Sequence, residues 1–378
     1  MITLISCTTT LRAQNHLLTG AEQTDQYLPL LKNKRVAVCV NHTSVIKTTH
    51  LVDSLRALGV NIIKIFVPEH GFRGTADAGE KINDSIDKKT SLPIYSLYGK
   101  NKIPTAAQLS NVDIVIFDLQ DVGARFYTYI STMHYLMNAC AGQNIPFVVL
   151  DRPNPNGHYV DGPVLEKKYS SFVGLHPIPI VHGLTVGELA QMINGEKWLD
   201  SNKVCPLTVI PCKNYSHKTS YTPPVKPSPN LPNRQSMLLY PSLCLFEGTV
   251  ISVGRGTDYP FQVIGAPHPQ YGNYTFTPQS KPGAKNPMYQ NMMCYGLDLR
   301  NHQSKPALQL QFLLDMYARC PDKKNFFTPF FNKLAGNESL QEQIKSGYTE
   351  EQIKQTWQAS LNQYKAMRKK YLLYEDFE

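Results

Sequence analysis

Three hydrophobic runs of the sequence are each followed at once by acidic residues and an arginine. Residues 61–67 lead into EHGFRG (69–74), residues 112–117 into DLQDVGAR (118–125), and residues 146–150 into DRPNPNG (151–157). Two carboxyl groups that flank a bond, one protonated and the other ionised, are the minimum for most glycosidases. The pattern therefore indicates acid–base chemistry by carboxylates that lie beside arginines.

Glu69 is the main catalytic candidate among these carboxylates. It lies in a loop flanked by glycines, next to His70 and Arg73, and loops on rigid scaffolds often carry functional residues. For an aspartate such as Asp118 or Asp151, turn formation or helix capping is an equally good explanation. A phosphoesterase or metal hydrolase built on the aspartates remains an alternative, although no spacing typical of a metal site supports it.

The elements that must position these residues are predicted from hydrophobic periodicity. Four short runs rich in β-branched residues are typical of strands buried on both faces of a parallel sheet, and they cover residues 35–40, 61–67, 112–119 and 146–150. Helix-period segments between them predict right-handed βαβ units and a Rossmann-like sheet. Since ligands of such sheets bind beyond the carboxyl ends of the strands, the three charged loops are expected at one edge.

The length of 378 residues predicts two domains, because single cores stop growing at about 250–300 residues. We expect a Rossmann-like catalytic domain over 14–205 and a smaller α/β or α+β domain over 206–378. The second half contains a proline-rich stretch at 223–232 and ends in a predicted amphipathic helix over 349–372, which a capping box opens.

Composition excludes several classes of protein. The 38 Lys and Arg against 29 Asp and Glu give a net charge of +9, but charged residues are only 18% of the chain. This sparse charge argues against a nucleic-acid surface, which clusters Lys and Arg. No G-x-G-x-x-G, Walker A, H-E-x-x-H or G-x-S-x-G motif is present. No cofactor and no metal are therefore expected, and no run is long enough for a transmembrane segment.

The N-terminus and the cysteines bear on the compartment. Residues 1–13 resemble the remnant of a signal peptide, and the sequence LISC ending at Cys7 resembles a lipoprotein cleavage box. We therefore expect an exported protein, periplasmic or extracellular. The eight cysteines lack C-x-x-C spacing and are expected to be buried free thiols, with Cys205 and Cys212 the only close pair that an oxidising compartment could join.

Nine motifs spread over the chain resemble the NamZ-type exo-β-N-acetylmuramidases, a bacterial family long described as having unknown function. They are EHGFRG (69–74), AGE (78–80), LPIYSLYG (92–99), FDLQDVGARFYTYISTM (117–133), LDRPNPNG (150–157), DGPVLE (161–166), HGLTVGELA (182–190), PSPNLP (227–232) and EGTVISVGRGT (247–257). The resemblance implies a Rossmann-like N-terminal domain, a smaller C-terminal domain and an active site in the cleft between them. It also implies release of N-acetylmuramic acid from the non-reducing ends of peptidoglycan fragments.

The residues of these motifs lead to a hypothesis for the roles of individual side chains. Glu69 and Glu80 are the expected catalytic pair, one as general acid or nucleophile and the other in the opposite role. The 3-O-lactyl carboxylate of N-acetylmuramic acid calls for an arginine fork. The expected substrate-binding residues are His70, Arg73, Asp118, Gln120, Asp121, Arg125, Tyr127, Asp151, Arg152, Asn154, Asn156, Glu166, His182, Glu247 and Arg255.

Some alternatives stay open at this stage. Family members often have Glu-Gly-Pro where this chain has Asp161-Gly162-Pro163, and the shorter side chain favours Glu69 and Glu80 over Asp161. Retention and inversion of the anomeric configuration are both possible, as is catalysis assisted by the substrate's N-acetyl group. A muropeptide-binding protein without catalytic activity is the main alternative to a hydrolase.

Overall fold

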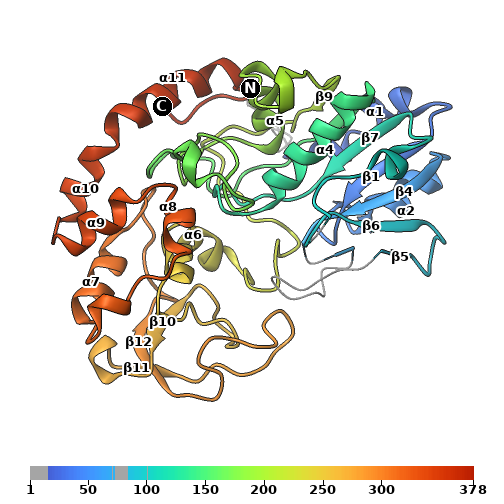
Figure 1. Ribbon diagram of the computed structural model, residues 1–378. Coiled ribbons are helices and arrows are strands. Elements are labelled where there is room, and N and C mark those ends of the chain that lie inside the picture. The colour runs from blue at the N-terminus through green and yellow to red at the C-terminus, as the bar shows by residue number, and fades with distance from the viewer. Residues whose placement is uncertain (1–15, 70, 73–83, 100) are drawn as a thin grey trace, which may run out of the picture.

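The computed structural model of the chain describes residues 16–69, 71–72, 84–99 and 101–378. Several predictions lie outside these residues: the signal-peptide remnant 1–13 with Cys7, and the site residues His70, Arg73 and Glu80. In Figure 1 a large sheet lies on the right and a small sheet at the bottom, joined by helices that run up the left side.

A seven-stranded sheet forms the first half of the molecule. Its strand order is β5-β6-β4-β1-β7-β8-β9, with all neighbours parallel except the edge strand β5. The six parallel strands therefore have the order 3-2-1-4-5-6 along the chain, the order of a doubly wound sheet. The strands are β1 (Val36–Val40), β4 (Ile62–Val67), β5 (Ser85–Ile86), β6 (Pro93–Ser96), β7 (Ile114–Asp118), β8 (Phe147–Leu150) and β9 (Leu207–Ile210).

The four predicted strands are confirmed as β1, β4, β7 and β8, and the mostly parallel α/β class is confirmed with them. Every residue of β1, β7 and β8 is buried, which is why these runs are continuously apolar. Strand β9 begins at Leu207 and belongs to the same sheet, so the sheet extends beyond the domain boundary predicted at residue 205.

Helices cover both faces of this sheet. Val36, Val38 and Val40 of β1 point into a core that α1 and α2 complete, whereas Ala37 and Cys39 point into a second core under α4 and α5. The helices of this half are α1 (Thr24–Leu31), α2 (Leu51–Ala57), α3 (Ala106–Leu109), α4 (Tyr129–Gln143) and α5 (Val186–Gly195). Helix α4 is capped at its C-terminal end by Asn144, which has the left-handed conformation, with φ 54°.

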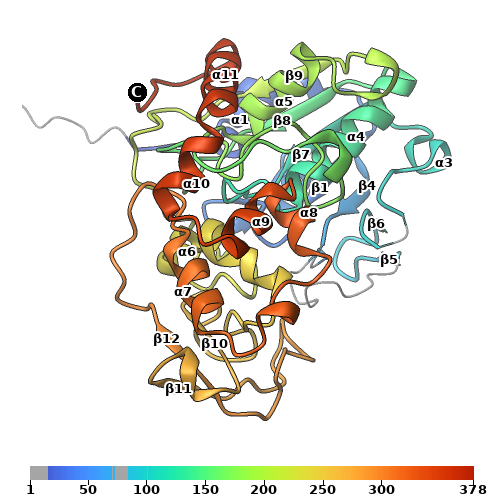
Figure 2. The ribbon, with the colours of Figure 1, turned by 60° about the vertical axis from the view of Figure 1, so that its left-hand side comes forward.

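The second half combines a small antiparallel sheet with helices. Strands β10 (Val263–Ala266), β12 (Cys294–Asp298) and β11 (Tyr274–Phe276) pair in that order, and β2 (Val45–Ile46) pairs with β3 (Thr49–His50) in the first half. The helices are α6 (Arg234–Leu243), α7 (Gln311–Arg319), α8 (Phe331–Ala335), α9 (Ser339–Lys345), α10 (Glu350–Thr356) and α11 (Gln358–Arg368). Figure 2 shows α7 to α10 between the small sheet below and α11 above.

The predicted C-terminal helix over 349–372 is divided in the structure. Its capping box at Thr349 is confirmed, but α10 ends at Thr356 and α11 begins after Trp357, whose backbone departs from helical geometry. After α11 the chain returns to the first half, where the backbone N–H of His217 donates to Glu375 O at 2.9 Å. The C-terminal residues after α11 thus link the two halves of the chain.

The described cysteines are all free and buried, as predicted, and Cys205 and Cys212 are not joined. In the described part of the chain no helix is long and apolar enough to cross a membrane. The same part contains no group of three or more His, Cys, Asp or Glu side chains arranged to hold a metal ion.

Candidate active site

Glu69 lies at the carboxyl edge of the large sheet, two residues after β4. The side chain is half-buried, and Thr128 Oγ1 donates a hydrogen bond of 2.9 Å to its Oε2. Thr128 directly precedes α4, which follows β7, the strand on the other side of β1 from β4. The doubly wound sheet therefore brings the two loops together, and one carboxylate oxygen of Glu69 has a fixed position.

A cavity of about 50 Å³ adjoins Glu69 and is lined by residues from both halves of the chain. The lining residues are Glu69, Phe126, Tyr127, Thr128, Tyr129, Ser228, Asn230, Leu231, Tyr240, Arg255 and Phe261. Three of the predicted site residues, Glu69, Tyr127 and Arg255, thus meet at one cavity. Glu247 joins them through an ion pair with Arg255.

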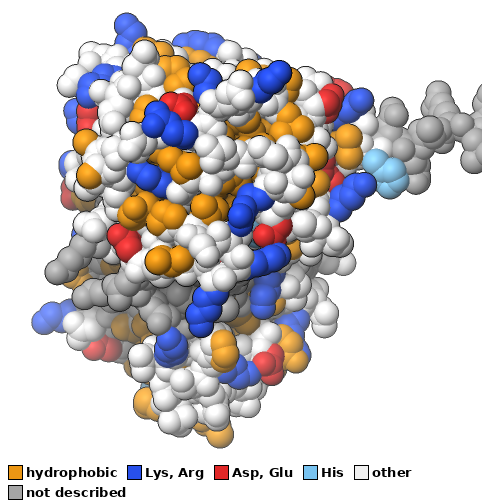
Figure 3. All heavy atoms as spheres, turned by 90° about the vertical axis from the view of Figure 1, so that its right-hand side faces the viewer, with side chains coloured by type: hydrophobic (Ala, Val, Ile, Leu, Met, Phe, Trp, Pro, Cys, Tyr) orange, Lys and Arg blue, Asp and Glu red, His pale blue; other side chains and the backbone are white. Residues whose placement is uncertain are grey.

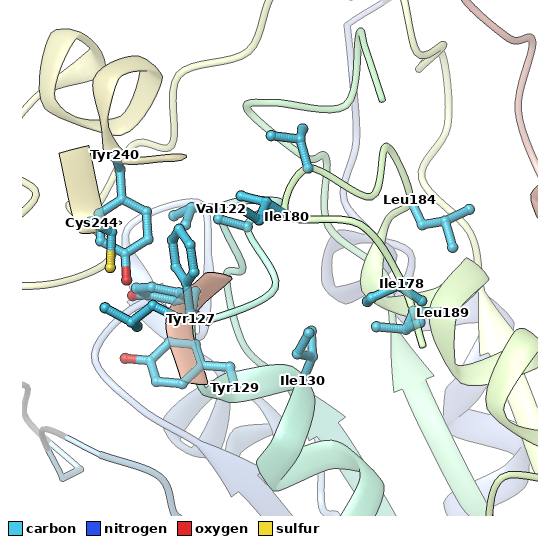
Figure 4. Close-up of a cluster of buried hydrophobic side chains, with 14 of the residues drawn as sticks. Val122, Tyr127, Tyr129, Ile130, Ile178, Ile180, Leu184, Leu189, Tyr240 and Cys244 are labelled. Atoms are coloured by element: carbon cyan, nitrogen blue, oxygen red, sulfur yellow. The ribbon is translucent and has the colours of Figure 1, made fainter. Parts of the chain in front are cut away.

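Three tyrosines form one wall of the cavity, and Figure 4 shows them converging from the start of α4 and from α6. The ring centroid of Tyr127 lies 4.7 Å from that of Tyr129 and 5.9 Å from that of Tyr240, with edge-on geometry in both pairs. The hydroxyl of Tyr127 donates to Pro227 O at 2.8 Å. Burial raises the pKa of all three tyrosines above the ordinary value, so their phenols stay neutral hydrogen-bond donors.

Arg255 enters the cavity from the segment between η4 (Cys244–Gly248) and β10. It stands between Gly254 and Gly256, whose φ angles of 75° and 81° are left-handed and favour glycine. Arg255 Nε donates to Glu247 Oε1 at 2.6 Å. Burial by itself lowers the pKa of Arg255, but the charge and hydrogen bond of Glu247 outweigh it and raise the pKa above the ordinary value.

Asp118 and Arg152 are not among the residues that line the cavity. Arg152 Nε and Nη2 contact the two carboxylate oxygens of Asp118 at 2.5 and 2.9 Å, and both side chains are almost completely buried. Arg152 Nη2 also donates to Val45 O. The pair joins the carboxyl ends of the neighbouring strands β7 and β8. All these contacts are with other residues of the chain, so they do not test sugar binding. Sugar binding by Asp118 or Arg152 stays a prediction.

Arg125 is also fully buried. Its Nη1 donates to the carbonyls of Pro163 and Ile178, and its Nη2 to those of Leu334 and Ala335 in α8, all at 2.8–2.9 Å. Burial lowers the pKa of Arg125 to about 9. The guanidinium therefore ties the loop before α4 to the second half of the chain. Binding of a substrate carboxylate by Arg125 stays a prediction.

The remaining predicted residues after β8 hold loops in place. Asp151 accepts hydrogen bonds from Thr185 Oγ1 at 2.7 Å, Gly187 N at 2.8 Å and Tyr374 O–H at 2.5 Å. Burial raises the pKa of Asp151 to about 6, although these hydrogen bonds oppose the rise. The amides of Asn154 and Asn156 donate to backbone carbonyls, from Asn154 to Leu184 O and from Asn156 to Val122 O and Met237 O.

Two further predicted residues, Gln120 and Glu166, lie away from the cavity lining, as does Asp161, which the sequence disfavoured. Gln120 Nε2 donates to the carbonyls of Asp121 and Pro153. The side chain of Glu166 is 48% exposed, with Lys168 Nζ 3.6 Å away. Asp161 Oδ2 accepts from Leu308 N and contacts Lys354. His134 of α4 is buried, with its Nδ1 3.0 Å from His176 Nε2.

Asp121 and His182 form a buried pair. His182 Nε2 lies 3.8 Å from Asp121 Oδ2, which also accepts from Gly123 N at 2.6 Å. Burial raises the pKa of Asp121 to about 7, with the hydrogen bonds from Gly123 and Val122 opposing the rise. Burial, together with the positive charges of Arg368 and Arg125, lowers the pKa of His182 to about 3. Asp121 is thus a carboxyl group that titrates near neutral pH in the loop before α4.

The raised pKa of Asp121 predicts a pH-dependent stability. Between about pH 4 and pH 7 the folded state holds a proton that the unfolded state has released, so the free energy of unfolding falls as pH rises, by up to about 1.4 kcal/mol per pH unit. We expect Asp121→Asn to remove this slope. The buried histidines make the free energy of unfolding rise with pH, which masks the slope from Asp121 in the parent alone. The measurement is therefore the difference in the free energy of unfolding between variant and parent, from urea denaturation at several pH values. A difference that does not vary with pH would contradict the assignment.

Sequence reasoning missed several residues that line the cavity. Thr128 and Tyr129 lie inside the motif FDLQDVGARFYTYISTM, and Ser228 and Asn230 lie inside PSPNLP, so these motifs already contained a signal for them. Tyr240 and Phe261 lie in no motif, and only the tertiary structure brings them to the cavity.

Fold and cavity together define a class of protein. It is a two-part α/β protein, with a doubly wound sheet and a small antiparallel sheet, that presents a carboxylate and an arginine to one cavity at the carboxyl edge of the large sheet. The chain belongs to the exo-β-N-acetylmuramidase NamZ family: residues 36–235 match the N-terminal domain of that family and residues 238–374 its C-terminal domain. Members of this family are glycoside hydrolases.

Similar proteins support this assignment. The chain is 41% identical over 373 residues to the peptidoglycan β-N-acetylmuramidase NamZ of Bacillus subtilis (strain 168), an alignment that covers 92% of this chain and 89% of the Bacillus protein. Two crystal structures of DUF1343 family proteins from Bacteroides fragilis NCTC 9343 are also similar. One has 50% identity and a TM-score of 0.90, covering 96% of this chain and 99% of that chain. The other has 29% identity and a TM-score of 0.82, covering 96% and 100%.

Proposed function

We propose that this chain is an exo-acting glycoside hydrolase that releases N-acetylmuramic acid from the non-reducing ends of peptidoglycan fragments. Family membership over nearly the whole chain supports the reaction. The observation that carries the proposal for the site is that Glu69, held by Thr128, shares one cavity with Arg255. A carboxyl group is one of the two that acid–base cleavage of a glycosidic bond uses, and an arginine is suited to bind an anionic sugar.

Glu69 is the proposed general acid or nucleophile. The hydrogen bond from Thr128 holds Oε2, so the carboxyl group keeps a constant orientation toward the bond to be cleaved. The second carboxylate takes the opposite role, and Glu80 is the proposed partner from the sequence. Glu247 is the alternative among the described residues, because its ion pair with Arg255 places it next to the cavity. The separation of the two carboxyl groups decides between retention at about 5–5.5 Å and inversion at about 6.5–9.5 Å.

The tyrosines and the surface charge suit the same substrate. Tyr127, Tyr129 and Tyr240 provide apolar ring surface beside the cavity for a pyranose. Figure 3 shows the face of the molecule on the right of Figure 1, where Lys and Arg side chains are more frequent than Asp and Glu around the junction of the upper and lower parts. The net charge of +9 has the sign that attracts anionic muropeptides.

The proposal also covers the position of the active site in the fold and the compartment of the protein. We place the active site in the cleft between the two domains, since the cavity is lined by residues before and after the junction of the family's two domains at 235–238. We also propose that the protein is exported, periplasmic or extracellular, and that Cys7 carries a lipid. The lipoprotein-like sequence at 4–7 supports this location.

An assay with paired aryl glycosides tests the function. We expect turnover of the aryl β-N-acetylmuraminide and little turnover of the matching β-N-acetylglucosaminide, and release of free N-acetylmuramic acid from a muramyl disaccharide. Failure to cleave the muraminide, together with binding of the disaccharide, would favour a muropeptide-binding protein. Loss of turnover in the presence of a chelator would favour the metal hydrolase instead.

A further inference from the structure

The described arginines that were expected near the substrate differ in how many of their donors are already used. Arg125 donates to four backbone carbonyls, and Arg152 binds both oxygens of Asp118 as well as Val45 O. Arg255 instead makes one hydrogen bond within the described part of the chain, from Nε to Glu247. Arg125 Nε also has no partner among the described residues, but of these three arginines Arg255 is the one that lines the cavity.

The environment of Arg255 favours an anion at its terminal end. Its Nη1 is buried and has no hydrogen-bond partner among the described residues, although the whole side chain is still 24% exposed. An unpartnered buried donor costs free energy, and an incoming acceptor removes that cost. The guanidinium carbon lies 5.1 Å from the ring centroid of Phe261, and Glu247 holds Nε from the other side. These two contacts fix the plane of the guanidinium before any ligand arrives.

The size of the cavity limits which part of a substrate enters it. The described residues leave a small cavity of about 50 Å³ beside Arg255, so we expect a short group of the substrate to reach the guanidinium. N-acetylmuramic acid differs from N-acetylglucosamine by a 3-O-lactyl group that ends in a carboxylate. A carboxylate matches the geometry of a guanidinium fork.

We propose that Arg255, positioned by Glu247, binds the lactyl carboxylate of N-acetylmuramic acid and is the residue by which this chain distinguishes that sugar from N-acetylglucosamine. The inference rests on the proposed function. It separates two tasks within one cavity: the first half of the chain supplies the catalytic carboxyl group of Glu69, and the second half recognises the sugar acid. Arg125 and Arg152 then support the architecture of the site without contacting the lactyl group.

The test compares Arg255→Met with Arg300→Met. Arg300 is a matched control, because it also pairs with an acidic residue, Asp298, and its guanidinium carbon lies 4.4 Å from the ring centroid of Tyr259, yet it does not line the cavity. Three aryl glycosides are used: the muraminide, its lactyl methyl ester and the glucosaminide. We expect Arg255→Met to lower kcat/KM for the muraminide about 10- to 100-fold, the loss typical of a charged hydrogen-bond pair.

The lactyl methyl ester and the glucosaminide, which lack the carboxylate, show whether the loss comes from recognition of that carboxylate. Supporting results are a kcat/KM for the ester and the glucosaminide within about twofold of the parent, no effect of Arg300→Met, and an intermediate loss in Arg255→Lys, which keeps the charge but not the fork. An equal loss on all three substrates, or no loss on the muraminide, would overturn the inference.

A binding experiment separates the test of this inference from the test of the proposed function. Calorimetric titration with free N-acetylmuramic acid and with N-acetylglucosamine needs no turnover. If the parent protein hydrolyses nothing, the proposed function fails, while loss of the preference for N-acetylmuramic acid in Arg255→Met still supports the role of Arg255. If the parent hydrolyses the muraminide and Arg255→Met keeps the preference, the inference alone fails.

Discussion

Replacing Glu69 by Gln is expected to lower kcat on a muramyl disaccharide by about 10²–10⁴-fold, the range that one positioned acid or base contributes. The amide keeps the size of the side chain and an oxygen that accepts the hydrogen bond from Thr128 Oγ1, so the loop is expected to stay in place. The amide cannot give up a proton to the glycosidic oxygen or attack the anomeric carbon. Steady-state kinetics give kcat, and titration with the disaccharide gives the dissociation constant.

The dissociation constant is expected to change little, because Glu69→Gln leaves Arg255 and the tyrosine wall intact. Glu166→Gln is the matched control, since Glu166 is a surface carboxylate beside Lys168 and lies outside the cavity lining. Turnover of Glu69→Gln at the rate of the parent would remove Glu69 from the mechanism. Equal losses in both variants would indicate a general effect of removing a negative charge.

The predictable part of the fold is the part that burial alone determines. Strands β1, β7 and β8 are buried at every residue and read as continuous apolar runs. Strand β9 has a mixed burial pattern, with Thr208 exposed and Ile210 buried, so its sequence carries a weaker signal. The interruption at Trp357 is invisible to a helical pattern, because Trp357 and Leu361 are both buried on the expected stripe although α11 starts between them.

The site was predictable only to the level of the loops. Strand ends placed Glu69, Tyr127 and the charged loops at the correct edge of the sheet, since parallel strands share a carboxyl edge. How deeply a given side chain is buried below that edge depends on tertiary contacts. Arg125 and Arg255 are the same residue type in similar glycine-containing motifs, yet one is satisfied by four carbonyls and the other faces the cavity. The sequence alone does not show which hydrogen-bond acceptors surround a guanidinium in the folded protein.

The buried pair of Asp118 and Arg152 leads to the largest expected effect on stability. In Arg152→Met the carboxylate of Asp118 keeps its buried position but loses both hydrogen bonds from the guanidinium. Removing one partner of a buried ion pair costs about 3–5 kcal/mol, because the remaining charge is neither solvated nor paired. We expect the free energy of unfolding to fall by this amount in urea denaturation at pH 7, with loss of activity following from displacement of the loops after β7 and β8.

An exposed pair in the same sheet provides the control. Arg35 Nη2 contacts Asp113 Oδ1 at 2.8 Å, just before β1 and β7 begin, but both side chains are open to water. Arg35→Met is expected to change stability little, because solvent screens such pairs. The double variant Asp118→Asn with Arg152→Met removes the buried charge as well and is expected to recover part of the loss. If Arg152→Met is no less stable than Arg35→Met, the pair does not support the sheet edge, and its guanidinium becomes available again as a ligand for the substrate.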